Sequence, residues 1–459
     1  MRWVASLVAL GLMMALFHHV TAASPLEARA ALALGFLLVA AWLGGELARR
    51  ARLPRITGFL VLGLCLGPAW LNLVHADEVG ALGFVADACV ALIAFTAGSA
   101  VPLVALRTED AALSRLAAAT IVVPLAVVTL VTLSVSARFP LTVHQPFGNA
   151  AAVALTLGVI AAASSSVVTV AVLEEERARG PFARTVLGVT VVKDLAVGAL
   201  LCVVVVASRL WASPGAVRLG AAGGALTRWA GALAMGAAAG ALAAQYLKLG
   251  RREAVLVLIG LAFVCALAAR GLHVEGALVA LAAGVYLGTV APEEATRLRA
   301  ELARAAGPVY AIAFTVAGAG FRLETLGLLW PWVLLLVGLR IVALRYGALW
   351  AGRSPALTPA HARAAWLGLI SQSGTALGLA AAARQAFPAW GVSLENLVVA
   401  LVAVQEVIGP VGLHHALVRV GELGGTPLVG AGAGSAPLPA GPAGGAQLGL
   451  PRLDVLRIR

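Results

Sequence analysis

The sequence predicts an all-α membrane protein that crosses the bilayer many times, and three features carry this prediction. The 459-residue chain is 61% hydrophobic and only 12% charged, whereas about 25% of residues are charged in a typical soluble domain. Apolar runs of roughly 20 residues recur along it, and a helix of that length spans the hydrocarbon core. Ten-residue stretches of alternating polarity, which a membrane barrel needs, are absent from the sequence. Because backbone groups in lipid need internal partners, these runs are expected to be helices.

The first apolar run, Trp3 to Val20, differs from the others. It follows the basic start MR and precedes HHVTAAS, as in a signal peptide that is cleaved near Ala22 or Ala23. We interpret residues 1–23 as a signal peptide or as an extra N-terminal helix. About 13 transmembrane helices then follow, with predicted bounds 29–48, 56–74, 79–102, 112–136, 149–172, 183–207, 220–246, 253–270, 274–290, 304–320, 327–351, 364–386 and 395–418.

Positive side chains in alternate loops orient these spans. Arginines cluster at 49–55, 107–115, 177–184, 251–252, 297–304 and 353–363, while the intervening loops are poorer in positive charge. The positive-inside rule places the arginine-rich loops in the cytoplasm, so the formal net charge of +12 reflects topology rather than a surface that binds nucleic acid. We predict a transmembrane domain over residues 29–420 and a disordered, Gly/Pro/Ala-rich cytoplasmic tail over 421–459. The location expected is a bacterial-type inner (plasma) membrane.

Patterns for cofactors, metals and enzymes are missing from the sequence. All four cysteines lie inside apolar runs, without the spacing of a metal site or a disulfide framework. The stretch GAGAG near the C-terminus has no strand before it and no helix after it, so it does not predict a dinucleotide site. We therefore expect that the protein binds no cofactor or metal, has no nucleotide-binding domain and is not an enzyme.

Three pairs of segments suggest an internal repeat. AFTAGSAVPL (94–103) resembles AFTVAGAGFRL (313–323), AAASSSVVTVAV (161–172) resembles LISQSGTALGLA (369–380), and VVKDLAVG (191–198) resembles AVQEVIGP (403–410). The members of each pair are seven predicted spans apart, an odd number, so they would cross the bilayer in opposite directions. We predict two inverted-topology repeats, which are typical of transporters with a binding site near the midplane.

The second of these pairs places polar residues in the middle of two spans. One span contains Ser164, Ser165 and Ser166, and the other contains Ser371, Gln372, Ser373, Gly374 and Thr375. Hydroxyls and amides can satisfy backbone groups where a helix is broken, and the ends of the half-helices then point at an ion. We predict crossed broken helices with this polar centre. The alternative is that the small residues only let neighbouring helices pack closely.

Four ionisable residues fall within predicted spans: Lys193, Asp194, Arg340 and Glu406. A charge at the centre of a membrane helix costs about 2.5–3.5 kcal/mol on insertion scales, so such residues usually face the bundle interior and mark an ion path. Neighbours in a helix point about 100° apart, so Lys193 and Asp194 need not contact each other. Arg340 could pair with Asp194, and Glu406 with Lys193. Glu406 lies near a span end and is expected to be partly solvated.

Two further carboxylates and two arginines are expected near span ends, where they would snorkel or face water. They are Glu46, Arg138, Glu275 and Arg345. We assign them no role.

Four stretches resemble the monovalent cation:proton antiporters of the second group, which include sodium/hydrogen and Kef-type exchangers. They are GGELARRARLPRITGFLVLGLCLGP (44–68), GFVADACVALIAFTAGSAVPLVALR (83–107), VLGVTVVKDLAVG (186–198) and QEVIGPVGLHHAL (405–417). The resemblance implies a 13-helix bundle with a core of broken helices, dimerisation helices, a homodimer and an elevator-like motion. It places the ion-binding acidic pair at Lys193 and Asp194.

The chain departs from the family pattern at this pair. Asp-Asp, Asn-Asp or Gln-Asp is common there, whereas Lys193 takes the first position here. Three hypotheses follow for the lysine: its ammonium competes with the transported ion and its deprotonation is one proton step, it forms a locked pair with Asp194, or it favours an anion. Arg340 matches, by span only, a basic residue that pairs with the site acid in several relatives.

We therefore expect a secondary transporter that exchanges Na⁺ or K⁺ for protons by alternating access. Asp194 and Lys193 would bind the ion and the proton, Arg340 and Glu406 would be supporting charges, and no nucleic acid would bind. The alternative is a transport-inactive or anion-moving relative in which Lys193 blocks the cation site and the protein acts as a membrane sensor or scaffold.

Overall fold

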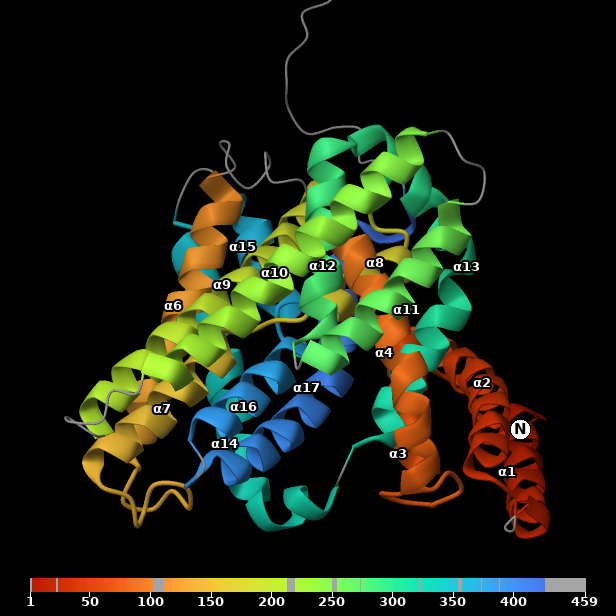
Figure 1. Ribbon diagram of the computed structural model, residues 1–459, viewed down its shortest axis with the longest axis horizontal. Coiled ribbons are helices and arrows are strands. Elements are labelled where there is room, and N and C mark those ends of the chain that lie inside the picture. Colours follow the sequence, from red (N-terminus) through yellow and green to blue (C-terminus); the bar gives the residue numbers. More distant parts are fainter. Residues whose placement is uncertain are drawn as a thin grey trace, which may run out of the picture. The chain divides into compact units, whose positions relative to one another are not determined.

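Every secondary-structure element in the described part of the chain is a helix, and Figure 1 shows the arrangement of these helices. This computed structural model describes residues 2–21, 24–101, 111–212, 219–249, 254–272, 274–321, 323–353, 357–372, 374–387 and 389–425. The helices are α1 (Arg2–Thr21), α2 (Leu26–Arg50), α3 (Arg55–Leu66), α4 (Ala76–Ser99), α6 (Ala111–Ser134), α7 (Phe147–Ala162), α8 (Ser166–Glu175), α9 (Pro181–Ala212), α10 (Leu219–Lys248), α11 (Ala254–Leu272), α12 (Gly276–Val290), α13 (Pro292–Ala319), α14 (Leu323–Ala351), α15 (Pro359–Gly368), α16 (Gly374–Ala386), α17 (Gly391–Val420) and the short 3₁₀ helix η1 (Leu423–Gly425). They overlap every predicted span, which confirms the all-α fold class.

The length and apolar composition of the helices identify a multi-pass membrane protein. Within the described ranges, eight helical segments are long and apolar enough to cross a membrane, and one of them is α7 followed by α8. Shorter apolar helices include α3, α12 and most of α1 and α11. The predicted signal peptide or extra helix is α1, which contacts α2 and buries Met14. Its cleavage stays a prediction. Of the tail predicted at 421–459, residues 421–425 are described and include the short helix η1, and the rest lies outside the described residues.

One predicted span had a wrong bound, and another is only part of a longer, bent helix. The span predicted at 56–74 ends as a helix at Leu66, because Gly67 and Pro68 follow and proline disfavours the helical conformation of the residue before it. The residues after Gly67 fold back, and the N–H of Leu73 donates to the carbonyl of Leu66 at 3.0 Å. The helix that contains the span predicted at 304–320 begins earlier, at Pro292, whose ring suits the first helical position. It is bent by 70° between Pro292–Arg304 and Ala306–Ala319, and the predicted span corresponds to the second part.

Two predicted spans are interrupted in their middle, as expected. The span at 149–172 consists of α7 and α8, separated by residues 163–165. The span at 364–386 consists of α15 and α16, separated by residues 369–373, of which Ser373 lies outside the described part. Ser166 is the first residue of α8 rather than part of the break.

Small residues let helices touch along their backbones. A Cβ atom at Gly98 of α4 would lie 2.2 Å from the carbonyl oxygen of Leu281 in α12, and one at Gly284 would lie 2.2 Å from the carbonyl oxygen of Phe95. Helices in lipid gain little from hydrophobic burial against one another, so close van der Waals packing stabilises them instead. These glycines thereby fix the distance between α4 and α12.

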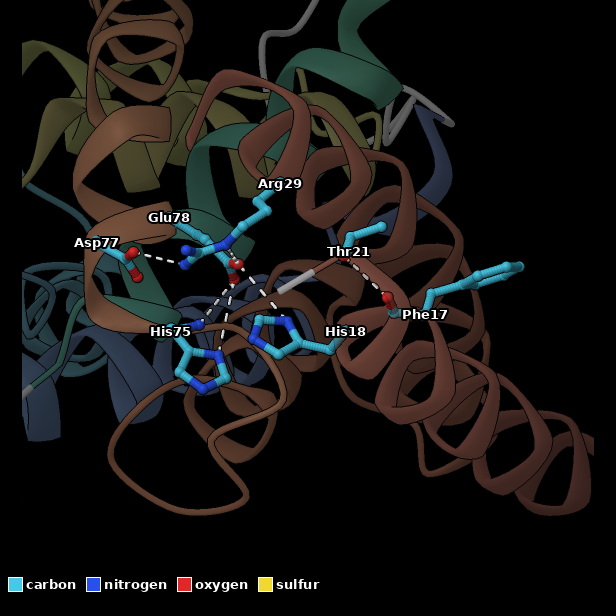
Figure 2. A network of polar contacts seen from close by, with 7 residues as sticks. All are labelled: Phe17, His18, Thr21, Arg29, His75, Asp77 and Glu78. Carbon is cyan, nitrogen blue, oxygen red and sulfur yellow. Dashed lines mark hydrogen bonds and ion pairs between the residues drawn. The ribbon is translucent and has the colours of Figure 1, made fainter. Parts of the chain in front are cut away.

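A buried carboxylate ties α1, α2 and α4 together, and Figure 2 shows its partners. Glu78 is fully buried. Its Oε1 accepts a hydrogen bond from Nε of Arg29 at 3.1 Å, and its Oε2 accepts one from the N–H of His75 at 2.9 Å. Nη2 of Arg29 also donates to Asp77 at 2.5 Å, and Nδ1 of His18 lies 3.6 Å from Glu78. This network anchors α1 through one residue, His18.

We predict that Gly98→Ala destabilises the protein by about 1–3 kcal/mol, the usual cost of overpacking a filled interior. The added methyl group must push α4 from α12. Thermal unfolding of the purified protein in detergent measures the effect as a lower midpoint.

Gly260→Ala is the matched control, because a Cβ there meets no atom within 4 Å. Equal effects of the two substitutions would contradict the role of Gly98 in close packing.

Candidate functional site

The breaks in the two interrupted helices lie against each other. The N–H of Ser165 donates to the carbonyl of Ser371 at 2.9 Å, and the hydroxyl of Ser164 donates to the carbonyl of Leu369 at 2.8 Å. Serines suit this place because a hydroxyl supplies a donor where the helix no longer does. The meeting point therefore holds four helix ends: the C-terminal ends of α7 and α15 and the N-terminal ends of α8 and α16.

Arg340 of α14 occupies the side where α7 and α15 end. The last carbonyls of a helix have no partner within that helix, and a buried carbonyl without a donor costs about 1–3 kcal/mol. A guanidinium carries five N–H donors in a rigid plane. Arg340 donates to four of these carbonyl oxygens: Ala161 at 2.9 Å, Ala163 at 2.5 Å, Leu369 at 3.1 Å and Ile370 at 2.6 Å.

Two glutamines extend this network. The side-chain oxygen of Gln405 in α17 accepts a hydrogen bond from Arg340, and its amide donates to Oε1 of Gln372 at 3.0 Å. The amide of Gln372 in turn donates to the carbonyl of Ile160 at 2.6 Å. Gln405 was overlooked in the sequence, although a glutamine beside Glu406 in the stretch AVQEVIGP was a signal for it. Together these groups hold α7, α14, α15 and α17 in one arrangement.

Asp194 of α9 lies on the opposite side of the meeting point, where α8 and α16 begin. Its Oδ2 accepts a hydrogen bond from the N–H of Ser166 at 3.2 Å, and its Oδ1 accepts one from the hydroxyl of Thr375 at 2.9 Å. Both donors are in the first turns of their helices. The N-terminal end of a helix carries partial positive charge, so two such ends favour a carboxylate between them.

Lys193 is adjacent to Asp194 in sequence but bonds elsewhere. Its Nζ donates to the hydroxyl of Ser164 at 2.9 Å, and Nη2 of Arg340 lies 3.4 Å from the same oxygen. Lys193 is 0% exposed and Asp194 is 3% exposed. As expected from their angular separation, Lys193 and Asp194 do not bond to each other in the described part of the chain, which disfavours the locked pair. The possible pairing of Arg340 with Asp194 does not occur there either. Instead, the positive groups face the negative helix ends, and the carboxylate faces the positive ones.

Glu406 and Glu275 differ from what the sequence predicted. Glu406 lies within α17 and is buried, so the expected solvation at a span end was wrong; it makes no hydrogen bond or ion pair with another described residue. Glu275, expected to face water, has its Oε1 shielded from solvent. The burial of this oxygen was not predicted, because a single sequence does not show that the start of α12 lies against α16.

A cavity of about 230 Å³ reaches Asp194. Its lining runs along α9 from Asp194 to Cys202 and along α16 from Gly374 to Gln385. This is far more than one water molecule needs. The lining also includes Glu275, Arg228 and Trp229. A separate cavity of about 780 Å³, lined by Arg49, Glu175, His414 and their neighbours, does not reach Asp194.

One cluster offers the donor types of a metal site. The ligand atoms of His18, His75 and Glu78 lie within 4.8 Å of one another. Figure 2 shows the three side chains grouped together. However, the two imidazole rings stack in nearly parallel planes with centroids 4.0 Å apart, and a metal binds an imidazole nitrogen in the ring plane at about 2.0–2.1 Å. Glu78 also already bonds to Arg29. The arrangement fits an ion-pair network better than a metal site.

The family model described as "Sodium/hydrogen exchanger, transmembrane" matches residues 33–418. The chain belongs to the sodium/hydrogen exchanger family. This places the exchanger among cation:proton exchangers, with Na⁺ and H⁺ as the transported species, and in a transporter class rather than an enzyme class. The resemblance stated from the sequence is thereby confirmed at the level of this family.

Solved structures support the same fold for the exchanger. It is similar to the sodium proton antiporter MjNhaP1 from Methanocaldococcus jannaschii at pH 8, with 17% identity, a TM-score of 0.56, and coverage of 87% of this chain and 96% of that chain. An electron-microscopy structure of the same antiporter gives 16% identity, a TM-score of 0.65, and coverage of 86% and 97%. At these identities the likeness concerns the fold. A comparison with curated protein sequences gives no match.

We predict that Arg340→Lys lowers the free energy of unfolding of the exchanger by about 3 kcal/mol or more. A lysine presents three donors in place of five and leaves buried carbonyls without partners. Thermal or denaturant unfolding in detergent measures the loss.

Arg345→Lys, on the same helix but with an exposed side chain, is the matched control and should change stability by less than about 0.5 kcal/mol. A tolerated Arg340→Lys would show that the guanidinium is not needed to hold the helix ends.

Proposed function

We propose that the exchanger moves Na⁺ against protons by alternating access, with Asp194 as the carboxylate that binds each of them in turn. One observation carries the proposal: the Asp194 carboxylate lies where the cavity meets the N-terminal ends of α8 and α16. Oxygen atoms of Asp194 and Thr375 suit a hard cation such as Na⁺. A buried carboxylate in a cavity is also the usual proton acceptor of a transporter.

Coupling follows from the cost of an unpaired charge. A carboxylate that holds Na⁺ or a proton is neutralised, whereas an empty carboxylate in a low-dielectric region carries its full desolvation cost. The loaded site can therefore change sides much more readily than the empty site. The site that carried Na⁺ to one side of the membrane must therefore bind a proton before it can move back. This couples the two ions and prevents Na⁺ from leaking through alone.

The position of the cavity at Asp194 supports alternating access. The cavity at Asp194 runs along α9 from Asp194 to Cys202 and along nearly the whole of α16, away from the arginine-rich loop at 177–184. It therefore faces the arginine-poor side, which the positive-inside rule predicts to be external. A separate space at Asp194, lined also by Ser166 and Leu281, measures only about 10 Å³. Exchange then needs a second state that opens toward the cytoplasm, and the homodimer and elevator-like motion expected for the family would provide its scaffold.

For Lys193 we propose the role of a second proton carrier. Its nearest bonded partner is the neutral hydroxyl of Ser164, which Arg340 also approaches. Arginine keeps its charge in proteins, while a lysine can release a proton when buried. If Lys193 releases a proton as Na⁺ binds to Asp194, two protons exchange for one Na⁺ and the reaction moves net charge.

A sensor or scaffold role and anion transport both fit the cavity less well than cation exchange. A sensor or scaffold with a locked site needs no cavity at Asp194, but the cavity there holds several waters by volume. An anion transporter would not place two carboxylates and one arginine, Asp194, Glu275 and Arg228, in the cavity lining. K⁺ in place of Na⁺ is an outcome of the first experiment below.

Asp194→Asn should abolish exchange, because an amide neither binds a proton nor neutralises a cation. Proteoliposomes with imposed Na⁺, K⁺ or Li⁺ gradients and an internal pH dye measure this. Asp87→Asn, on an exposed carboxylate of α4, should keep wild-type rates. Wild-type vesicles that respond to none of the three gradients would overturn the proposal.

Lys193→Gln should make exchange electroneutral if Lys193 carries the second proton. The rate of Na⁺-driven proton movement in the wild type should then depend on a membrane potential set by K⁺ and valinomycin, and the variant should lose this dependence. A variant with unchanged voltage dependence would exclude Lys193 as a carrier, and a faster one with the same dependence would identify the lysine as an inhibitor.

A further inference from the structure

A second carboxylate shares the cavity with Asp194. Glu275 directly precedes α12, but its side chain makes no capping hydrogen bond with that helix. Its Oε1 is shielded from solvent and has no hydrogen-bond partner among the described residues. A shielded carboxylate oxygen without a donor costs free energy. The site is therefore expected to have a use other than fold stability.

The helix opposite Glu275 makes room for its carboxylate. A Cβ atom at Gly378 of α16 would lie 2.7 Å from Glu275 Oε2, and one at Gly374 would lie 3.2 Å from Glu275 Oε1. The two glycines are four residues apart and share one face of α16. Thr375, in the same turn, donates to Asp194. One turn of α16 thus lies against both carboxylates, and both line the same cavity.

The chemistry of the lining favours a cation. Asp194 and Glu275 supply carboxylate oxygens, and Arg228 supplies the one positive side chain in the lining. No ion pair joins Arg228 to either carboxylate in the part of the chain that the structure describes, so the carboxylates are not neutralised by it. Carboxylate groups in a narrow, low-dielectric cavity concentrate cations.

We propose that Glu275 is an outer cation-binding group, which binds Na⁺ in the external cavity before the ion reaches Asp194. This inference rests on the proposed function, because it concerns the same transported ion. Glu275 does not take part in the exchange of proton for cation. Its carboxylate sets how much Na⁺ occupies the cavity, and so the apparent affinity rather than the maximal rate.

Glu275→Gln tests the proposal in proteoliposomes with Na⁺-driven proton movement. Glutamine keeps the size of the side chain and removes its charge. We expect the apparent KM for Na⁺ to rise about tenfold, with a maximal rate within about twofold of the wild type. Glu275→Asp, which restores a carboxylate, should recover part of the affinity. Glu293→Gln, at an exposed carboxylate, is the matched control and should change neither value.

Gly378→Ala gives a second test that leaves every charge in place. Its methyl group would press on Glu275 Oε2, so the KM for Na⁺ should rise as it does in Glu275→Gln. The glycine change should add little further in the double variant, because both act on one carboxylate.

Failure of the inference can be told apart from failure of the proposed function. If Asp194→Asn abolishes exchange and Glu275→Gln leaves the KM within twofold, Glu275 is no cation site and the proposed function stands. If the wild type shows no exchange, the inference is tested by binding alone, through the rise of the unfolding temperature with added NaCl relative to choline chloride. An equal NaCl dependence in the wild type and Glu275→Gln would then overturn it.

Discussion

Two interrupted helices meet in the middle of the bundle, and the charges at their ends determine where the buried charged residues lie. Two carbonyl ends face one way and two N–H ends face the other. A folded chain in lipid must satisfy both sets internally, because no water is there to do so. Arg340 satisfies the carbonyl ends, and Asp194 accepts from the N–H end of α8. Lys193 and Asp194 follow this division although they are neighbours in sequence.

The two sides of the meeting point differ in how completely they are bonded. On the carbonyl side, Arg340, Gln372 and Gln405 form a connected network with short bonds to several helices. Such a fully satisfied network rigidifies the elements that it joins. On the N–H side, Asp194 has two donors and borders a cavity. A firm frame and an accessible carboxylate are what an exchanger needs, since the ion must bind and leave while the helix ends stay in place.

Charge balance also explains how one fold can accept a lysine beside the central aspartate. Lys193 is directed at Ser164, at the carbonyl side, so it does not occupy the space in which a cation would contact Asp194. The nearby guanidinium of Arg340 shares the same hydroxyl. The departure from the more common acidic or amide residue therefore alters the charge of the region without closing the cavity.

The sequence by itself determined the fold class, the breaks near 164 and 372, the family and the residue pair Lys193–Asp194, because hydropathy, polar interruptions and buried charges are local properties of the chain. It also indicated, from the 100° turn between neighbours, that the pair need not be bonded. Only the tertiary structure decided the partners: Arg340 binds carbonyls rather than Asp194, Glu406 is buried, and Gln405 and Glu275 lie in the site. These facts depend on which helices pack together and at what depth. A single sequence fixes neither, because every span has several apolar faces that could serve as the contact.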